Sequence, residues 1–232
     1  YVEMTLEVLV KHGFDGAVNP DLSGLWVPGN QTFVPCNHTV PGDFSSAAFL
    51  LAAGAITSSR TIVDNLVFQT AQGDRAILDI LQKMGIPVMI RDTSIEVKSG
   101  TLSGVDIDAK DIPDLVPVCA VLACYAEGKS TIFNAKRLRL KESDRLESIS
   151  TELRKMGADI VVSEDSLMIN GGRQLHGATI DPHNDHRIAM SCAVAALGAK
   201  GETKIQDIEC INKSYPQFFS DLRVLGADIV GI

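Results

Sequence analysis

The sequence lacks the features that mark membrane-spanning, secreted and nucleic-acid-binding chains. It contains no run of about 18 apolar residues, so no segment is long enough to span a membrane. No basic stretch followed by an apolar stretch opens it, so no secretory signal is visible. The formal net charge of −8 argues against a general nucleic-acid surface. Any anionic ligand must therefore be bound by cations that cluster locally.

Disulfide and metal patterns are also missing. The 5 cysteines are an odd number, and most of them lie in apolar runs such as "VPVCAVLAC". Such residues are typically small buried hydrophobes in a reducing compartment, so we expect a cytoplasmic location. No C-x-x-C or H-x-x-x-H spacing accompanies them. The sequence therefore predicts no metal site.

The composition is that of a globular protein. The chain has 232 residues, of which 45% are apolar and 22% are charged. This length is enough for one large domain or two small ones. The first residue is Tyr1, and "YVEMTLEVLVKHG" has a helical pattern from the start. We expect the chain to be part of a longer protein.

A repeat of roughly 70 residues is the strongest organisational signal. Four predicted helices end in related ways, at "LEVLVKHGFDG", "LDILQKMGIPV", "ELRKMGADIVV" and "DLRVLGADIVG". Each glycine can adopt the left-handed conformation that stops a helix, and a β-rich stretch follows it. The glycines, spaced 72, 72 and 69 residues apart, are Gly13, Gly85, Gly157 and Gly226.

A second mark recurs in step with the glycines. Asp43, Asp114 and Asp185 are 71 and 71 residues apart, and each precedes an apolar helix of small residues. A short turn and a strand follow each of these helices. One full unit is therefore predicted to run helix, strand, helix, glycine, strand, hairpin, strand.

The two helices of a unit differ in pattern. The first helices, over residues 44–55, 115–125 and 187–198, are so apolar that we expect burial on nearly all sides. The second helices, such as 144–156, have one apolar stripe and should lie outside the first. The stripe residues of this helix are Leu146, Ile149, Leu153 and Met156.

Three such units predict a pseudo-threefold α/β (α+β) domain over residues 41–232. Residues 1–40 resemble the tail of a fourth unit: a helix, a loop with proline and glycine, and a strand over 32–38. We expect this tail to be the remnant of an N-terminal domain whose main part lies upstream. The three repeats of the larger domain have approximate bounds of 41–102, 103–172 and 173–232.

The third unit stops early. Its "GADIVGI" supplies one strand, whereas the second unit continues into "SEDSLMINGG". We infer that a strand from the upstream part of the protein completes the final hairpin.

Polar residues gather at the predicted helix starts. Residues 136–145 contain five cations and two carboxylates, directly before an apolar stripe. Helix N-termini carry unpaired N–H groups and partial positive charge, which favour bound anions. Lys141, Arg145, Arg187 and Lys213 stand at such starts. The pattern indicates a phosphate or carboxylate site.

Structural explanations of the same residues compete with this interpretation. The three repeat aspartates can be helix N-caps, and for Asp43 we favour the cap. For Asp114 the cap and a functional role both remain open. Glu142 and Arg145 are i,i+3 neighbours and could form a surface pair contributing under about 0.5 kcal/mol. Cations at a helix start oppose the helix dipole, so a structural explanation of Lys141 and Arg145 must invoke carboxylate partners.

Four motifs together carry a family resemblance. They are "PGDFSSAAFLLAAGAI", "LRLKESDRLESISTELRKMGADI", "NDHRIAMSCAVAALGAKGETKIQD" and "NKSYPQFFSDLRVLGA". From Tyr1 to the end, the chain closely resembles the C-terminal portion of the 5-enolpyruvylshikimate-3-phosphate synthase family, the 3-phosphoshikimate 1-carboxyvinyltransferases. Any one motif alone is weak, but K-E-[ST]-D-R with N-D-H-R and K-[ST]-[YF]-P is highly specific.

The resemblance implies a fold and a reaction. The fold would be two inside-out α/β barrels of the enolpyruvyl transferase type, each of three repeats, closing on a cleft at the helix N-termini. The enzyme, a transferase of the shikimate pathway, would move the enolpyruvyl group of phosphoenolpyruvate to the 5-hydroxyl of shikimate 3-phosphate. Phosphate would be released through a tetrahedral intermediate, with no metal and no cofactor. Its partners would be these two small substrates and the missing N-terminal domain in cis, without nucleic acid or membrane.

The resemblance also implies residue roles in proton transfer. Asp114 corresponds to the base near the substrate hydroxyl. Glu142 and Lys213 correspond to the pair that protonates and then deprotonates the enol carbon.

Other positions correspond to ligand-binding residues. Arg145 and Arg187 match the clamp on the phosphoenolpyruvate carboxylate, and Lys213 lies near its phosphate. Lys141 matches a shikimate-phosphate ligand. Tyr1 matches the tyrosine of an S-x-x-Y substrate segment whose serine precedes the first residue here.

Two departures and two rivals qualify the resemblance. Arg137 stands where some members have a substrate-contacting Asn, so that role is not carried over. This chain alone should hold half a cleft, so we expect it to fold without turnover. One rival is the related UDP-N-acetylglucosamine enolpyruvyl transferase. The other is a non-catalytic α/β repeat module, which predicts that the polar helix starts scatter in space.

Overall fold

The chain divides into two compact units. The computed structural model describes residues 2–57 and 59–231. The first unit contains the residues up to Pro41 together with Gln69–Gln72. The second contains Gly42–Phe68 and the residues from Gly73 onward. The assignment of the first unit to an upstream domain stays a prediction.

The first unit is built from an exposed helix and a small hairpin. Helix α1 (Val2–Lys11) has no buried residue. Strand β1 (Ala17–Val18) pairs antiparallel with β2 (Leu25–Trp26). The strand expected over residues 32–38 is wrong, since these residues form no ladder. Pro35 in their middle has no N–H to donate, which interrupts strand pairing.

The second unit contains three repeats that share the order helix, strand, 3₁₀ helix, helix and differ in their remaining strands. The first repeat contains α2 (Phe44–Ile56), β3 (Arg60–Asp64), the 3₁₀ helix η1 (Gly73–Ala76), α3 (Ile77–Lys83), β4 (Val88–Ile90) and β5 (Ser94–Lys98). The second contains β6 (Asp106–Asp108), η2 (Pro113–Leu115), α4 (Val116–Tyr125), β7 (Lys129–Phe133), η3 (Lys136–Leu140), α5 (Arg145–Lys155), β8 (Asp159–Val162) and β9 (Leu167–Asn170). The third contains β10 (Thr179–Ile180), α6 (His186–Gly198), β11 (Lys204–Ile205), η4 (Ile208–Lys213) and α7 (Phe218–Val224).

The first helices of the three repeats form the core of this unit. Helices α2, α4 and α6 contact one another in all three pairings. Most residues of these helices are buried, as expected from their apolar composition. None of the helices in the described part of the chain is long and apolar enough to cross a bilayer.

The second helices lie against the first and end at glycines. On α5 the predicted stripe is fully buried, and the helix contacts α4 and α6. The left-handed stop is confirmed at all four repeat glycines, whose φ values run from 79 to 103. They are Gly13, Gly85, Gly157 and Gly226.

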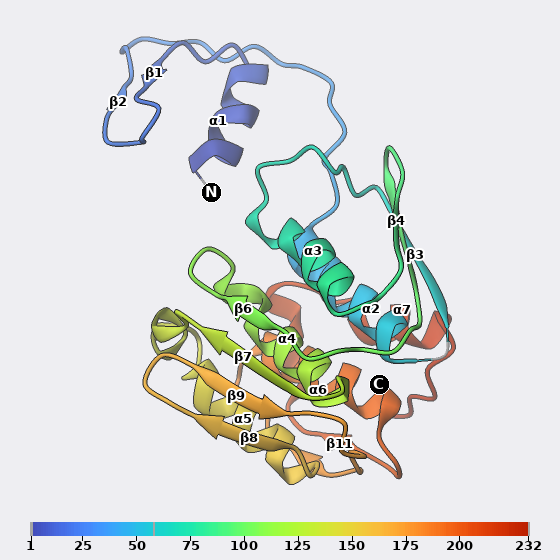
Figure 1. The fold of residues 1–232 in the computed structure, drawn as a ribbon. Coiled ribbons are helices and arrows are strands. Elements are labelled where there is room, and N and C mark those ends of the chain that lie inside the picture. The colour runs from blue at the N-terminus through green and yellow to red at the C-terminus, as the bar shows by residue number, and fades with distance from the viewer. Residues whose placement is uncertain (1, 58, 232) are drawn as a thin grey trace. The chain divides into compact units, whose positions relative to one another are not determined.

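Short sheets cover these helices (Figure 1). The first repeat has the antiparallel order β3-β5-β4, and the second has β6-β7-β9-β8, with β6 parallel to β7. Alternate residues point inward, as the buried Ile132, Leu167 and Ile169 show. Strands β7 and β9 contact α4, so helices lie inside and strands outside.

The third repeat has a smaller sheet. Strands β10 and β11 form a parallel pair, and residues 227–231 form no strand. The carbonyl of Ile229 nevertheless accepts from Arg223, as Ile160 accepts from Arg154 one repeat earlier. Residues 227–231 therefore occupy the position in the third repeat that β8 occupies in the second.

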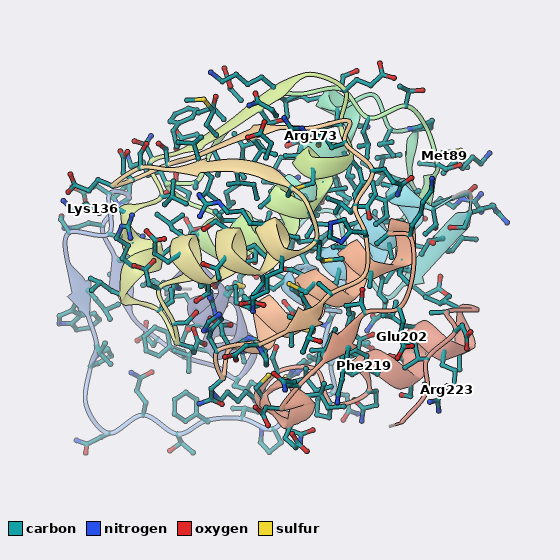
Figure 2. All side chains as sticks on the ribbon, turned by 90° about the horizontal axis from the view of Figure 1, so that it is seen from below. Met89, Lys136, Arg173, Glu202, Phe219 and Arg223 are labelled. Atoms are coloured by element: carbon teal, nitrogen blue, oxygen red, sulfur yellow. The ribbon has the colours of Figure 1, made fainter. Side chains whose placement is uncertain are left out.

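A cavity of about 860 Å³ adjoins this reduced sheet. Its lining includes the β11 strand and residues 228–231. Glu202 and Phe219, both labelled in Figure 2, also line it. In the second repeat, β9 lies between the equivalents of these two segments. That an upstream strand completes the third sheet stays a prediction.

Candidate functional site

The basic segment before α5 is shaped by its own carboxylates. Asp144 caps the helix, because its Oδ1 accepts the backbone N–H of Glu147 at 3.3 Å. Arg139 donates to Asp144 at 2.8 Å and so neutralises it. The start of α5 therefore satisfies its own charges with these residues. Lys141, Glu142 and Arg145 take no part in the contacts of Asp144.

Arg145 is the centre of the cluster. Its side chain is 1% exposed and binds three carboxylates. Nη1 donates to Asp114 at 2.7 Å, and Nη2 donates to Glu142 at 2.6 Å. Nε and Nη2 donate to the two oxygens of Asp185, at 2.8 and 3.3 Å. Buried charges need such pairing, so this one guanidinium holds polar groups from three helix starts together.

Asp114 lies in η2, directly before the buried helix α4. Besides Arg145, its carboxylate faces Lys141 Nζ at 3.2 Å and Arg187 Nε at 3.8 Å. Burial raises the pKa of this carboxyl, but the charges of Arg187, Lys141 and Arg145 outweigh burial and lower it to about 2. Asp114 is therefore ionised at neutral pH.

The N-D-H-R segment is a tight turn that starts α6. His183 and Asn184 both have left-handed backbone angles, with φ of 53 and 54. Asp185 follows and caps the helix by accepting the N–H of Arg187 at 2.9 Å. Asp185 is thus both a cap and a partner of Arg145. Arg187 donates to the carbonyl of Asp114 at 3.1 Å, which joins the second and third repeats.

A buried glutamate supports this turn from α5. Glu152 is fully buried and accepts from His183 Nε2 at 2.9 Å and from the backbone N–H of Asp181 at 3.0 Å. Lys155 Nζ is 2.7 Å from the same carboxylate. Glu152 therefore holds the start of this turn, at Asp181 and His183, against α5.

Lys213 stands at the end of η4 and contacts the same turn. Its Nζ donates to the carbonyl of Asn184 at 3.0 Å. Asp114, Glu142, Arg145 and Arg187 are thus joined by direct contacts, and Lys213 joins them through the residue before Asp185. The scatter of polar helix starts that a non-catalytic module predicts is not what the structure shows.

The first repeat contributes Asp74. Ser45, in the first turn of α2, donates to Asp74. Burial is the main cause that raises the pKa of Asp74. The positive charge of Arg187 lowers this pKa, and the negative charge of Asp114 raises it. Gln72–Asp74 stand at the start of the second helix of the first repeat, where K-E-S-D-R stands in the second repeat.

Two further members of the cluster were not predicted from the sequence. Ser143 donates to Asp185 at 3.1 Å. His186 Nδ1 is buried without a hydrogen-bond partner, 4.0 Å from a Glu142 oxygen and 3.9 Å from Asp185. Burial, followed by the charge of Arg187, lowers the pKa of His186, so the ring is neutral at pH 7. Its place in N-D-H-R was the only sequence signal for it.

The predicted site residues differ in accessibility. The side chains of Glu142 and Lys141 are 37% and 28% exposed, whereas Arg145 is enclosed by its carboxylates. Arg137 is exposed. Tyr1, predicted to bind substrate, lies outside the described residues.

Asp43 has the local role that the sequence favours. It caps α2 by accepting the N–H groups of Ser45 and Ser46, at 3.0 and 2.9 Å. The same repeat position is therefore a cap at Asp43, an ion-paired carboxylate at Asp114 and both at Asp185.

Known proteins are similar to this chain in sequence and in fold. A profile of EPSP synthase (3-phosphoshikimate 1-carboxyvinyltransferase) matches residues 1–222. A 3-phosphoshikimate 1-carboxyvinyltransferase of Methanocella arvoryzae is 48% identical over 231 residues, covering 99% of this chain and 54% of that protein. One of Methanocaldococcus jannaschii is 42% identical over 230 residues, covering 99% and 53%.

Solved structures agree on the fold. EPSP synthase from Acinetobacter baumannii has a TM-score of 0.83 at 29% identity, over 95% of this chain and 53% of that one. The enolpyruvyl transferase NikO from Streptomyces tendae has a TM-score of 0.78 at 22% identity, over 98% and 53%, and shows the fold alone. The predicted inside-out α/β fold of the enolpyruvyl transferases is therefore confirmed.

The chain matches only part of each relative. The chain spans about half the length of the curated relatives it matches. Within that half, the match to the family profile and the identity of more than 40% run through the whole cluster around Arg145. The chain belongs to the EPSP synthase (3-phosphoshikimate 1-carboxyvinyltransferase) family.

Proposed function

We propose that the protein containing this chain transfers the enolpyruvyl group of phosphoenolpyruvate to the 5-hydroxyl of shikimate 3-phosphate and releases phosphate. Family membership supports this reaction, and its relatives carry the name of that activity. The structural observation that carries the proposal is the Arg145 network. It joins Asp114, Glu142 and Asp185 within hydrogen-bond distance of one guanidinium.

Anion binding follows from the cations around this network. Arg187 and Lys141 flank Asp114, and Lys213 stands at the N-D-H-R turn. The N-termini of α5 and α6 add partial positive charge at the same place. Arg187 would bind the phosphoenolpyruvate carboxylate, Lys213 would lie near its phosphate, and Lys141 would bind the phosphate of the shikimate substrate.

Asp114 would accept the proton of the attacking hydroxyl. Its pKa of about 2 makes it a weak base in the free protein. Bound anions would neutralise Arg187 and Lys141, the two cations that lower this pKa most. The carboxylate would therefore become more basic when both substrates are present. This couples proton abstraction to a filled site.

Glu142 and Lys213 would handle the methylene carbon. One adds a proton to C3 as the hydroxyl oxygen bonds to C2 of phosphoenolpyruvate. The tetrahedral adduct then loses a C3 proton and phosphate, which restores the double bond. Glu142 is accessible enough to reach a ligand. The His186 ring beside it is neutral, so it does not neutralise the charge of the Glu142 carboxylate.

Arg145 was predicted to clamp a carboxylate together with Arg187. In this structure all of its donor groups face protein carboxylates, so ligand binding would require it to release Glu142 or Asp114. We propose that Arg145 mainly positions these two groups, and that Arg187 is the more accessible carboxylate ligand. The names of the relatives favour the shikimate substrate over a UDP-aminosugar.

An assay of phosphate release by the full-length protein tests the proposal. Release should require both substrates, and Glu142→Gln and Lys213→Met should each lower kcat by about 10²-fold or more, as for groups engaged in proton transfer. Lys136→Met, which alters an exposed ion pair, is the matched control and should keep full activity. Phosphate release without shikimate 3-phosphate, or full activity of both site variants, would refute it. The 232-residue chain alone should fold and show no turnover.

A further inference from the structure

Three potential metal ligands meet in the first unit, although the sequence predicts no metal site. His12 directly follows α1, while Cys36 and His38 lie in the extended segment 24 residues further along. One donor atom from each residue lies within 4.8 Å of the others. The three residues share nothing with the Arg145 network, so the inference does not depend on the proposed reaction.

The spacing of the donor atoms is that of a tetrahedral site. Cys36 Sγ is 3.7 Å from His12 Nε2 and 3.6 Å from His38 Nδ1. For zinc with bonds of about 2.3 Å to sulfur and about 2.0–2.1 Å to nitrogen, tetrahedral angles place a sulfur and a nitrogen ligand about 3.6 Å apart. The imidazole rings are 5.4 Å apart at an interplanar angle of 80°, so they do not stack and their nitrogens can converge.

A backbone carbonyl fixes the tautomer of His12 that a metal requires. His12 Nδ1 is 3.0 Å from the carbonyl oxygen of Val34. Because a carbonyl only accepts, Nδ1 must carry the proton, and in the neutral ring Nε2 then presents its lone pair. Nε2 is the nitrogen closer to Cys36. Such a bond from the second ring nitrogen to a carbonyl is usual for metal-bound histidines.

We propose that His12 Nε2, Cys36 Sγ and His38 Nδ1 form a three-ligand binding site for Zn²⁺, with a fourth position for water. Thiolate and imidazole are typical ligands of Zn²⁺, whereas the hard cations Mg²⁺ and Ca²⁺ prefer oxygen ligands. Cys36 loses its proton on binding, and this proton leaves to solvent.

The first unit has little else to order it. Helix α1 buries none of its residues, and apolar side chains such as Trp26 and Phe33 are exposed. A bound metal would link the end of α1 to residues 34–38, where the backbone pair between Val34 and His12 already joins them. Small units without a sizeable core commonly gain stability from a structural metal.

Cobalt substitution tests the site on the metal-free 232-residue chain. One equivalent of Co²⁺ should produce thiolate-to-metal charge-transfer absorption and the visible bands of tetrahedral cobalt, and Zn²⁺ should abolish both by displacement. Cys36→Ser and His38→Asn should weaken Zn²⁺ binding more than about 100-fold, since even an outer-shell partner contributes about 10- to 100-fold. His176→Asn, which removes an exposed histidine elsewhere, should leave the spectrum unchanged.

A second measurement needs no variant. Cys36 is exposed and Cys119, Cys124, Cys192 and Cys210 are buried, so alkylation of the native chain reports on Cys36. Zn²⁺ should slow modification of Cys36 severalfold, as mapped by mass spectrometry. A thiol that merely hydrogen-bonds to the two imidazoles would give no charge-transfer band and no zinc protection. Either of those results, or a band that survives in Cys36→Ser, would overturn the proposal.

Discussion

Arg145 and Asp185 form a bidentate ion pair in which neither side chain is more than 1% exposed. The pair joins the start of α5 in the second repeat to the start of α6 in the third. The sequence places these residues 40 positions apart and gives each a separate local explanation. Their pairing connects the packing of the repeats to the geometry of the candidate site.

Loss of Arg145 should therefore be costly. Arg145→Ala leaves Asp185 buried with no compensating cation, and we expect the free energy of unfolding to fall by about 3–5 kcal/mol. Arg145→Lys should recover only part, since an ammonium cannot bind three carboxylates in the geometry of the guanidinium fork. Urea unfolding measures both variants. Lys136→Ala, at an exposed pair with Glu164, should cost less than about 1 kcal/mol. Equal effects of Arg145→Ala and Lys136→Ala would contradict the burial argument.

Acid should destabilise the fold through Asp114. The pKa of Asp114 is lowered from its usual value of 3.8 to about 2, so as the pH falls the unfolded chain binds this proton before the folded one does. The resulting stability, about 2 kcal/mol, is present above the unfolded pKa and is lost as pH falls through the folded value. The difference in unfolding free energy between the wild type and Asp114→Asn should shrink from pH 5 to pH 2. A difference that stays constant over this range would show that Asp114 is not strongly ion-paired.

Glu152 should stabilise the turn that carries Asp185 and Arg187. Glu152→Ala removes the acceptor for His183 and for the backbone N–H of Asp181, which should cost about 1–3 kcal/mol. Glu147→Gln is a control on the same helix, because Glu147 is exposed and pairs weakly with Arg139 at 3.4 Å. Thermal unfolding of both variants gives the comparison. A Glu152→Ala protein as stable as Glu147→Gln would remove the supporting role of this carboxylate.

Gly104 should not tolerate a side chain. A methyl group there would overlap the backbone carbonyl of Lys129, and one at Gly177, the equivalent position in the third repeat, would overlap that of Glu202. Backbone atoms cannot move aside as a flexible side chain can, so Gly104→Ala should cost at least about 1–3 kcal/mol. Gly29→Ala meets open space and is the control. Chemical denaturation compares the two, and similar midpoints would show that β6 and β7 can separate at little cost.

The repeat could be predicted from the sequence because it rests on local rules. Glycines with positive φ stop helices at intervals of about 70 residues, and apolar helices without a polar face must be buried. The motif K-E-S-D-R and the motif N-D-H-R pointed to the site for the same reason. Charged residues at helix starts are local features that remain visible in one chain.

The strand predicted over residues 32–38 does not form. The sequence pattern there is apolar, but strand formation needs a partner with free donors and acceptors, and Pro35 interrupts the segment. The unassigned roles of His186 and Glu152 have a similar origin. Each depends on a neighbour at least 30 residues away or across a helix start, which no local pattern encodes.

The sequence by itself determined the three repeats, the burial of α2, α4 and α6, and the positions at which charged residues begin each helix. These follow from hydrophobic periodicity and from the conformational freedom of glycine. Only the tertiary structure decided that Arg145 binds Asp114, Glu142 and Asp185 together, and that His12 meets Cys36 and His38. Ion pairs and metal ligands act over a few ångströms in space, and chain packing alone brings distant residues within that range.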